Sequence, residues 1–368
     1  MPTANRIAGA LFGAALGDAL GAQAEFVPSA SGICERWPPA GPEEPTRRHA
    51  GWSSGGALTP SGQLPFLVTD DTQMMLAVGD ALLAVPDVFD ANDGPAKVTT
   101  ALRDAFTEWL NDPRNHRAPG NTCLAACQAL ERDDDASRWA QHTVIDSKGC
   151  GANMRVQSIG LLRCGDTDRA GLAQLQAAMT HGHPTALAAA DITAYTLAML
   201  AEGRETPETL LDALRLYALD QASTYHTRWL GDLWRRTGDD SPESFIARGW
   251  RDIDSSLKDL RDAMASPTRW RGLLNDDAND PCVATGDAWV AEEAFATGLL
   301  CFLLFPHEPM ACLRRAVVTR GDSDSIACLA GAFVGAYHGV DAWPATWVSD
   351  IEYKAELDQL VSGIAPPS

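Results

Sequence analysis

Two neighbouring carboxylates stand directly before an apolar segment of the chain. The stretch LVTDDTQMMLAVGDALL, which begins at Leu67, sets Asp70 and Asp71 between two threonines and continues with Met, Leu and Val. Adjacent carboxylates repel each other unless positive charge lies nearby. A helix N-terminus with water could absorb that repulsion, or a bound cation could.

A second acidic cluster lies far away in the sequence, in TRGDSDSIACLAGAFVGAYHG. Asp322 and Asp324 alternate with serines there, just before a helix of small residues. Each cluster alone could simply cap a helix, because Asp, Ser and Thr are preferred at the N-cap and acids suit the first turn. If the two helix starts converge, they would offer four carboxylates and at least two hydroxyls.

A ligand set made only of oxygens favours particular ions. Carboxylates and hydroxyls suit Mg²⁺, Mn²⁺ or Ca²⁺, whereas zinc and copper prefer His and Cys. The spacing excludes an EF-hand, because Ala327 occupies the sixth position from Asp322, where a glycine is required. No GxxxxGK[ST] loop occurs in the sequence, which excludes a P-loop nucleotide site.

Three further segments carry groups that could bind or act on a ligand. In DSKGCGANMRVQSIG, Gly149 and Gly151 could let backbone N–H groups approach a phosphate, or could form a plain turn before a helix. In THGHPTAL, His181 and His183 precede a helix, where such a pair is more typical of capping or packing than of metal binding. Glu25 follows the first predicted helix in GDALGAQAEF, and by itself it could be a surface acid.

All these segments lie beside predicted helices, and helical periodicity dominates the chain. Period-two runs rich in Val, Ile and Thr are nearly absent, so the sequence predicts an all-α protein with a multi-helix core. The expected helices are Ile7–Leu20, Thr72–Ala84, Lys97–Leu110, Leu124–Arg132, Thr185–Ala201, Glu208–Leu219, Asp254–Met264, Ala288–Phe305, Pro309–Val318 and Ser325–Tyr337. Two stretches are predicted loops, a Pro-rich one over about 34–65 and an acidic, then Gly-rich one over 130–155. Neither resembles a flexible linker, so we expect a single domain over residues 1–368.

Composition narrows the classes of partner and compartment. The 368 residues include 49 acidic and 29 basic ones, a net charge of −20 without a basic stripe, so no nucleic-acid partner is expected. The nine cysteines are scattered and form no CxxC pair, which argues against a disulfide framework or a cysteine zinc site and favours a reducing, cytoplasmic location.

Asp18 interrupts the apolar N-terminal run, which is therefore expected to be a core helix rather than a signal peptide. No stretch reaches the roughly 18 uninterrupted apolar residues of a membrane span, so no membrane association is expected.

The order of the motifs is itself informative. GDALGxxxEF, TDDTQM, SxGxGxxMR, TH and GDSDS follow one another between about Arg6 and Gly339. This order resembles the ADP-ribosylglycohydrolase family, which includes dinitrogenase reductase-activating glycohydrolases and ADP-ribosylarginine hydrolases. The resemblance implies a compact all-α fold, a central binuclear Mg²⁺ or Mn²⁺ centre, and cleavage of the N- or O-glycosidic bond between ADP-ribose and a modified residue.

The resemblance also implies roles for individual residues. The two metal ions would be held by oxygen ligands from both acidic clusters, namely Thr69, Asp70, Asp71, Asp322, Asp324 and Ser325. The diphosphate and proximal ribose would be bound by the glycine-containing loop and one histidine, namely Ser147, Gly149, Cys150, Gly151, Met154, Arg155 and His181. Glu25, Asp70 and Asp322 are then the expected catalytic residues, and Glu25 matches an acid that gates the site or assists water in some relatives.

The chain departs from the family pattern at some positions. Ser158 stands where the family often has a proline after its MR pair, and Arg320 stands where it often has the first glycine of GGD. Neither change removes a ligand, but Arg320 could alter the rim of the pocket. The Pro-rich loop and a Trp-rich stretch within about 220–285 have no motif counterpart, and the second of these could be an insertion.

Several functions stay open on the sequence alone. The leading one is removal of ADP-ribose from an ADP-ribosylated protein, with arginine as the expected linkage because the serine in GDSDS is associated with arginine-directed relatives. A cognate ADP-ribosyltransferase system would be a natural partner. The alternatives are hydrolysis of ADP-ribosylserine, poly-ADP-ribose or a small ADP-ribosyl metabolite, a two-metal phosphoesterase that cuts the pyrophosphate, and an inactive relative that only binds ADP-ribose.

Overall fold

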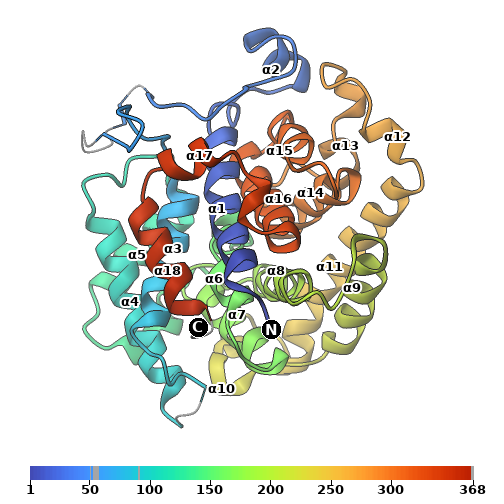
Figure 1. The fold of residues 1–368 in the computed structure, drawn as a ribbon. Coiled ribbons are helices and arrows are strands. Elements are labelled where there is room, and N and C mark those ends of the chain that lie inside the picture. Colours follow the sequence, from blue (N-terminus) through green and yellow to red (C-terminus); the bar gives the residue numbers. More distant parts are fainter. Residues whose placement is uncertain (50, 53–57, 90–91, 366–368) are drawn as a thin grey trace.

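The computed structural model describes residues 1–49, 51–52, 58–89 and 92–365, and within these ranges the regular structure is helical (Figure 1). The helices are α1 (Ala4–Gly21), α2 (Ala30–Arg36), α3 (Asp70–Leu83), α4 (Gly94–Asn111), α5 (Asn121–Glu131), α6 (Gln157–Leu161), α7 (Asp166–Ala178), α8 (Pro184–Glu202), α9 (Pro207–Gln221), α10 (Thr227–Leu230), α11 (Pro242–Met264), α12 (Pro267–Trp270), α13 (Cys282–Thr285), α14 (Ala291–Leu304), α15 (Pro309–Val317), α16 (Ser323–His338), α17 (Ala345–Asp350) and α18 (Lys354–Ile364). Short 3₁₀ turns cover Ala136–Gln141, Cys150–Ala152, Leu233–Arg236, Asp277–Asn279 and Val340–Ala342.

The all-α prediction is confirmed for this described part of the chain. Its only β structure is a set of isolated bridges, which join Phe66 to Ile351, Val144 to His181 and Gly149 to Val290. Each expected helix has an observed counterpart, although α11 begins at Pro242 rather than near residue 254. The predicted Pro-rich loop over 34–65 overlaps the end of α2, and its residues 50 and 53–57 lie outside the described residues.

Helix α1 runs through the middle of the molecule, beside α16 on one side and the pair α3 and α18 on the other (Figure 1). Its four glycines recur every fourth residue, at Gly9, Gly13, Gly17 and Gly21, so they share one face of the helix. A Cβ added at any of them would lie closer than 3.0 Å to a backbone carbonyl oxygen of α16. We call this line of contact the glycine seam. It brings the C-terminal end of α1 against the first turn of α16, where the second acidic cluster lies.

Helix α8 forms the other axis of the core. It is long and apolar enough to cross a membrane by length and composition, but 94% of its apolar window is buried inside the protein by other helices. Helices α7, α11, α14 and α16 pack around it. This position explains its composition, because a helix that is apolar all round belongs in a core as readily as in a lipid bilayer.

The stretch over about 220–285, which the sequence suggested as a possible insertion, packs against this core. It forms α10 to α13, and its long helix α11 packs against α8 and α14. Helix α11 begins with a capping box in which the Ser241 and Ser244 side chains bond each other's backbone amides. Phe245 and Trp250 then bury their rings in the core.

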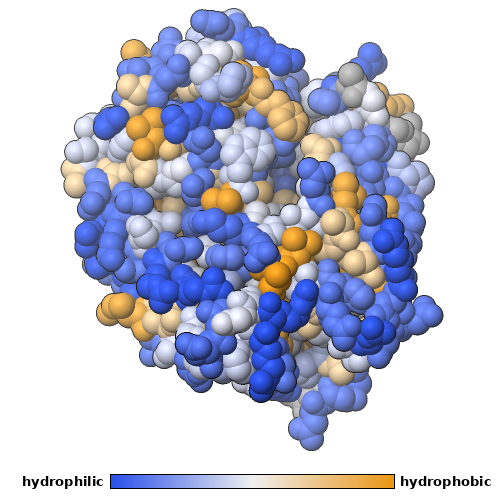
Figure 2. Space-filling model, turned by 180° about the vertical axis from the view of Figure 1, so that it is seen from behind, coloured by the Kyte–Doolittle hydropathy of each residue, from blue (hydrophilic) through white to orange (hydrophobic). Residues whose placement is uncertain are grey.

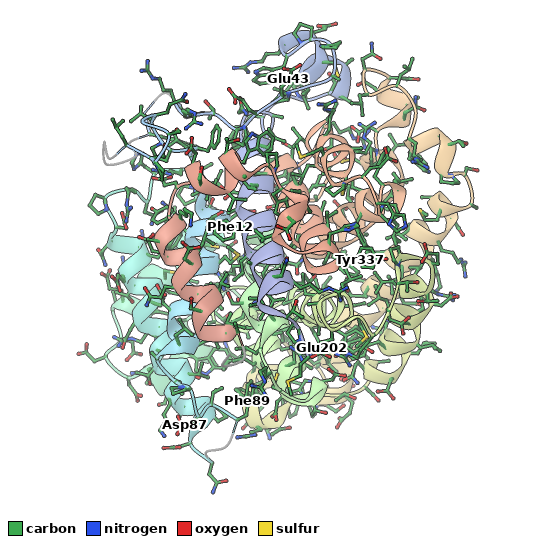
Figure 3. The ribbon with its side chains drawn as sticks, in the orientation of Figure 1. Phe12, Glu43, Asp87, Phe89, Glu202 and Tyr337 are labelled. Carbon is green, nitrogen blue, oxygen red and sulfur yellow. The ribbon has the colours of Figure 1, made fainter. Side chains whose placement is uncertain are left out.

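The surface matches the strong acidic balance of the chain. On the face in Figure 2, hydrophilic residues predominate and hydrophobic ones form small separate groups. Phe12 of α1 lies in the middle of the molecule, whereas Glu43 and Asp87 lie at its periphery (Figure 3).

One buried carboxylate lies in the core, away from either acidic cluster. Asp191 of α8 is 1% exposed and accepts hydrogen bonds from the Tyr217 hydroxyl at 2.7 Å and the Gln174 side-chain amide at 2.8 Å. Burial raises the pKa of Asp191 to about 7, even though both hydrogen bonds lower it. The folded protein therefore binds this proton more tightly than the unfolded chain does.

Asp191→Asn should remove a pH dependence of stability. For the wild type, the contribution of Asp191 is fully present below about pH 4 and is lost as pH rises towards 7, at up to about 1.4 kcal/mol per pH unit. The variant keeps a side chain of the same shape without the charge, so its stability relative to wild type should rise over that interval. Urea unfolding at a series of pH values measures this difference. A constant difference between pH 4 and 7 would contradict the prediction.

Candidate active site

A cavity opens where the first turns of α3 and α16 meet the glycine-containing loop. Its volume is about 210 Å³. It is lined by Glu25, Asp70, Asp71, Ala118, Gly120, Asn121, Thr122, Cys123, Gly149, Cys150, Gly151, Met154, His181, Trp289, Asp322, Asp324 and Ser325. The two acidic clusters, 252 residues apart from Asp70 to Asp322, therefore converge on one cavity, as expected if they form one site.

The first turn of α3 is capped mainly by groups other than its two carboxylates, although the Asp70 carboxylate also interacts with its own amide. The Thr69 hydroxyl accepts the amide of Asp71 at 3.2 Å, and the Arg117 carbonyl accepts the amide of Asp70 at 3.4 Å. The Asp70 carboxylate instead accepts the Gly120 amide at 3.3 Å, and the Asp71 carboxylate accepts the Ser325 hydroxyl at 3.1 Å. Helix capping therefore does not account for this acidic pair.

In the first turn of α16, the Asp322 carboxylate likewise takes no part in capping the helix, whereas Asp324 does. Asp322 occupies the N-cap position, yet its side chain makes no capping hydrogen bond. Its carboxylate lies 2.8 Å from the Cys150 thiol, which donates to it across the cavity. The Asp324 carboxylate accepts the neighbouring Ser325 amide at 3.0 Å and also shares a side-chain hydrogen bond with the Asp322 carboxyl group. Both carboxylates remain directed at the cavity.

The electrostatics of the cavity are those of crowded, buried acids. Burial first, and repulsion from Asp324 second, raise the pKa of Glu25 to about 11. The same causes raise the pKa values of Asp70, Asp71 and Asp322 well above their usual range. No Lys or Arg side chain is present among the cavity-lining residues of the described chain to offset these charges.

The donor set fits a divalent cation. Glu25, Asp322 and Asp324 each present a carboxylate oxygen within 4.8 Å of the other two, and all three residues are buried. Within the described ranges no donor hydrogen-bonds the Glu25 carboxylate, although only 8% of this residue is exposed. A buried acid without a partner is costly unless a proton or a cation compensates it. The oxygen ligands are of the kind that Mg²⁺ and Mn²⁺ prefer.

The glycine-containing loop lies over His181. Isolated bridges tie its flanks to Val290 and to the segment at His181, and a Cβ on Gly151 would lie 2.7 Å from the Cys123 sulfur and 3.1 Å from the His181 ring. The Cys150 amide donates to the Trp289 carbonyl at 3.3 Å and the Gly149 amide donates to the Ser147 hydroxyl at 3.5 Å, so both of these loop amides already have partners within the protein. Burial lowers the pKa of His181 to about 3, which keeps its imidazole neutral.

Three residues of the predicted site do not line the cavity. Thr69 is fully buried with its hydroxyl engaged in the helix cap, and the Ser147 hydroxyl pairs with that of Thr122 at 2.9 Å. The Arg155 guanidinium is completely buried, stacks on Phe106 at 4.4 Å, and donates to Gln176 and Thr180. The structure therefore places Arg155 behind the cavity wall, where it braces the segment that carries His181.

Other residues at the cavity were not expected from the sequence. The segment from Ala118 to Thr122 forms part of its wall, and Ala118 adopts a left-handed φ of 58°. Trp289, which is 47% exposed, stands at the rim as an aromatic surface. Asp18 of α1 does not line the cavity but lies behind it, where it accepts the Thr69 amide at 3.0 Å. Asp18 belongs to the GDALG motif, so this motif could have identified the residue from the sequence.

Comparisons with known proteins agree with this fold and cavity. A sequence model of the ADP-ribosylglycohydrolase family matches residues 1–367. The chain is 27% identical to ADP-ribosylhydrolase ARH3 of Mus musculus, over 98% of this chain and 91% of that protein. It is 24% identical to the ADP-ribosyl-[dinitrogen reductase] glycohydrolase of Rhodospirillum rubrum, over 96% of this chain and 92% of that protein.

A solved structure supports the same fold. An ADP-ribosylglycohydrolase-related protein complex contains a chain that superposes with a TM-score of 0.62 at 22% identity, over 98% of this chain and 97% of that one. The match to the family model over nearly the whole length decides the assignment. This chain belongs to the ADP-ribosylglycohydrolase family of hydrolases.

Proposed function

We propose that this enzyme removes ADP-ribose from ADP-ribosylated protein and that the arginine linkage is its first candidate substrate. The observation that carries the proposal is the convergence of two remote acidic clusters on one cavity that has no Lys or Arg in its described lining. The last serine of GDSDS, Ser325, favours the arginine linkage over the serine linkage, poly-ADP-ribose or a small ADP-ribosyl metabolite.

The proposed metal ligands are the oxygen-bearing residues of the two helix starts, with two Mg²⁺ or Mn²⁺ ions as the expected occupants. They are Thr69, Asp70, Asp71, Asp322, Asp324 and Ser325. Such ions neutralise the carboxylates, lower the pKa of a bound water and bind sugar hydroxyls. Thr69 would have to contribute through its hydroxyl while that oxygen also caps α3.

The chain's own residues suit cleavage of a ribosyl bond. Such cleavage builds positive charge on the sugar, which the carboxylates of Asp70 and Asp322 would stabilise. Glu25 lines the cavity, and bound cations would lower its raised pKa, so in the metal-loaded enzyme it is the acid best placed to take a proton from water. Neutral His181 can donate or accept a hydrogen bond to the ribose without adding charge.

Product analysis tests this proposal. Purified enzyme would be incubated with ADP-ribosylarginine and ADP-ribosylserine peptides and with poly-ADP-ribose, each in the presence of Mg²⁺. Free ADP-ribose is the expected product, released fastest from the arginine peptide. AMP or other phosphate esters would instead identify a phosphoesterase, and binding of ADP-ribose without any product would identify an inactive relative.

Activity should require a divalent cation. Exhaustive EDTA treatment should abolish ADP-ribose release because nothing else in the cavity lining offsets the carboxylates, and added Mg²⁺ or Mn²⁺ should restore it. A circular dichroism spectrum of the treated enzyme serves as the control for folding. Full turnover by the chelated enzyme would exclude a metal-dependent mechanism.

Gly151→Val should weaken ADP-ribose binding without emptying the metal site. The new side chain would push against Cys123 and His181, but none of the proposed metal ligands lies in this loop. The affinity should fall by about tenfold or more, as expected when a ligand-contacting loop is displaced by one steric clash. Calorimetric titration of ADP-ribose into the metal-loaded protein measures the loss.

A matched control is available at Gly165. An added Cβ there meets nothing within 4 Å, and its φ of −69° suits any residue. Gly165→Val should therefore bind ADP-ribose like wild type. Equal affinity in both variants would reduce the Gly149–Gly151 loop to a structural turn and leave the diphosphate without an assigned site.

We also propose that the chain acts as a single domain in the cytoplasm. One continuous cluster of buried apolar side chains, from Ile7 to Ile364, supports the first proposal. The second is supported by the nine cysteines, which are all free thiols. The proposed partner is an ADP-ribosylated protein together with the transferase that modifies it, and the acidic surface gives no reason to propose nucleic acid or a membrane.

A further inference from the structure

Asp18 is a buried acid that faces the first turn of another helix. It lies on the last turns of α1 and is fully buried. Its two carboxylate oxygens accept the amide of Thr69 at 3.0 and 3.1 Å, and one of them also accepts the amide of Thr72 at 3.1 Å and the Thr72 hydroxyl. Every one of these donors belongs to the TDDT stretch.

This position is a costly one for a carboxylate. No Lys, Arg or His forms an ion pair with Asp18 among the described residues, and Asp324 of the acidic cluster is near enough to repel it. A buried charge without an ionic partner destabilises a fold unless hydrogen bonds compensate it. The donors of the TDDT stretch supply that compensation, which couples the conformation of this stretch to Asp18.

The coupling has a consequence for the neighbouring carboxylates. The first amides of a helix need partners outside the helix, and acidic side chains of the first turn commonly supply them. Here Asp18 accepts the amides of Thr69 and Thr72, so these two amides need no partner from the side chains of Asp70 and Asp71. Their carboxylates line the cavity instead.

Asp18 also connects the two halves of the ligand set. It lies between Gly17 and Gly21, whose faces touch the backbone of α16 at Ala327 and Ser323. One short piece of α1 therefore contacts the first turn of α16 through the glycine seam and holds the first turn of α3 through Asp18.

We propose that Asp18 is a positioning residue that fixes the TDDT turn against α16, so that carboxylates from both helices can share one set of cations. This inference rests on the proposed function, because it assumes that the cavity binds divalent metal. It does not place Asp18 among the metal ligands, and the residue does not line the cavity.

The test is a titration of Mn²⁺ into the metal-free protein, followed by electron paramagnetic resonance of the free ion. Asp18→Asn should bind Mn²⁺ about 10- to 100-fold more weakly than wild type, the loss typical of residues that orient metal ligands. Asp191→Asn is the matched control, since Asp191 is an equally buried carboxylate held by two side-chain donors away from the cavity. Its Mn²⁺ affinity should equal that of wild type, whatever its stability.

A second variant separates position from charge and remains usable if Asp18→Asn does not fold. Thr72→Val keeps the charge of Asp18 and all six proposed ligands but removes the hydroxyl that Asp18 accepts. It should weaken Mn²⁺ binding about threefold, the effect of losing one hydrogen bond of roughly 0.7 kcal/mol. The variant's melting temperature without metal reports whether the fold is intact.

The outcomes are distinguishable. If wild type binds no Mn²⁺, the proposed function fails and the inference fails with it. If wild type binds Mn²⁺ and folded Asp18→Asn binds it equally well, the inference alone is overturned. If Thr72→Val binds like wild type, Asp18 acts through its charge or its packing and the positioning role is overturned. An equal loss of affinity in Asp191→Asn would show that general destabilisation is the cause.

Discussion

Asp322→Ala is expected to lower kcat for hydrolysis of ADP-ribosylarginine by at least about 10²-fold while the protein remains folded. Asp322 contributes one of three carboxylate oxygens that lie within 4.8 Å of each other, so its loss should deplete both the proposed metal site and the negative charge proposed to stabilise the reacting sugar. Its side chain makes no capping bond to α16, so the helix should persist. The metal-free variant should even melt at a higher temperature than metal-free wild type, because one buried like charge is gone.

Asp287→Ala is the matched control for this experiment. The Asp287 carbonyl accepts the Asp322 amide at 2.8 Å, but its carboxylate pairs with Arg320 and is absent from the cavity lining. The control therefore removes a neighbouring acid and should retain most of the activity. Release of ADP-ribose and thermal melting in EDTA are the two measurements. Wild-type turnover by a folded Asp322→Ala enzyme would leave the GDSDS cluster without a chemical role.

Gly17→Ala should destabilise the fold by more than about 4 kcal/mol, or prevent folding, although it adds a single methyl group. The added Cβ would lie closer than 3.0 Å to three backbone atoms of Ala327 and Cys328, which cannot turn aside as a side chain could. Intrinsic helix propensity predicts the opposite sign, since alanine is favoured over glycine by about 1 kcal/mol. The direction of the change therefore separates the two effects.

Gly79→Ala provides the comparison within another helix. The three atoms nearest to a Cβ at Gly79 of α3 all belong to the Leu360 side chain, which can shift more readily than backbone can. This variant should stay within about 1 kcal/mol of wild type, close to the propensity effect alone. Urea unfolding of both variants gives the free energies of unfolding. A Gly17→Ala protein as stable as wild type would mean that α1 and α16 can separate without cost.

The main helices could be predicted from the sequence because their apolar residues recur with a helical period over long stretches. Other helices could not be predicted because they bury polar side chains. Helix α7 was missed because Gln174, Gln176 and Arg169 occupy its buried face, where an amphipathic pattern requires apolar residues. In the fold the Gln174 amide donates to Asp191, the Gln176 amide to the Ala152 carbonyl, and the Arg169 guanidinium to carbonyls such as that of Gly160. Such partners come from distant parts of the chain and leave no local signal.

The candidate site was likewise only partly predictable from the sequence. The motifs located the acidic clusters and the glycine-containing loop, because residue type and spacing alone carry that information. They did not indicate that Arg155 faces Phe106 and Gln176 behind the wall, since the direction of a side chain depends on helices packed elsewhere. Trp289 was missed for a related reason, because a single tryptophan has no spacing to recognise and only the fold brings it to the cavity.

The glycine seam sets a limit on how this enzyme can be remodelled. Along it, main chain touches main chain, so no exchange of side chains can widen or narrow the gap between α1 and α16. The packing of these two helices therefore fixes the distance between the acidic clusters, which cannot change unless the fold changes. The rim is built differently, because Trp289 lines the cavity with an exposed side chain that can be exchanged. A library that seeks a new leaving group should randomise the rim and keep every α1 glycine.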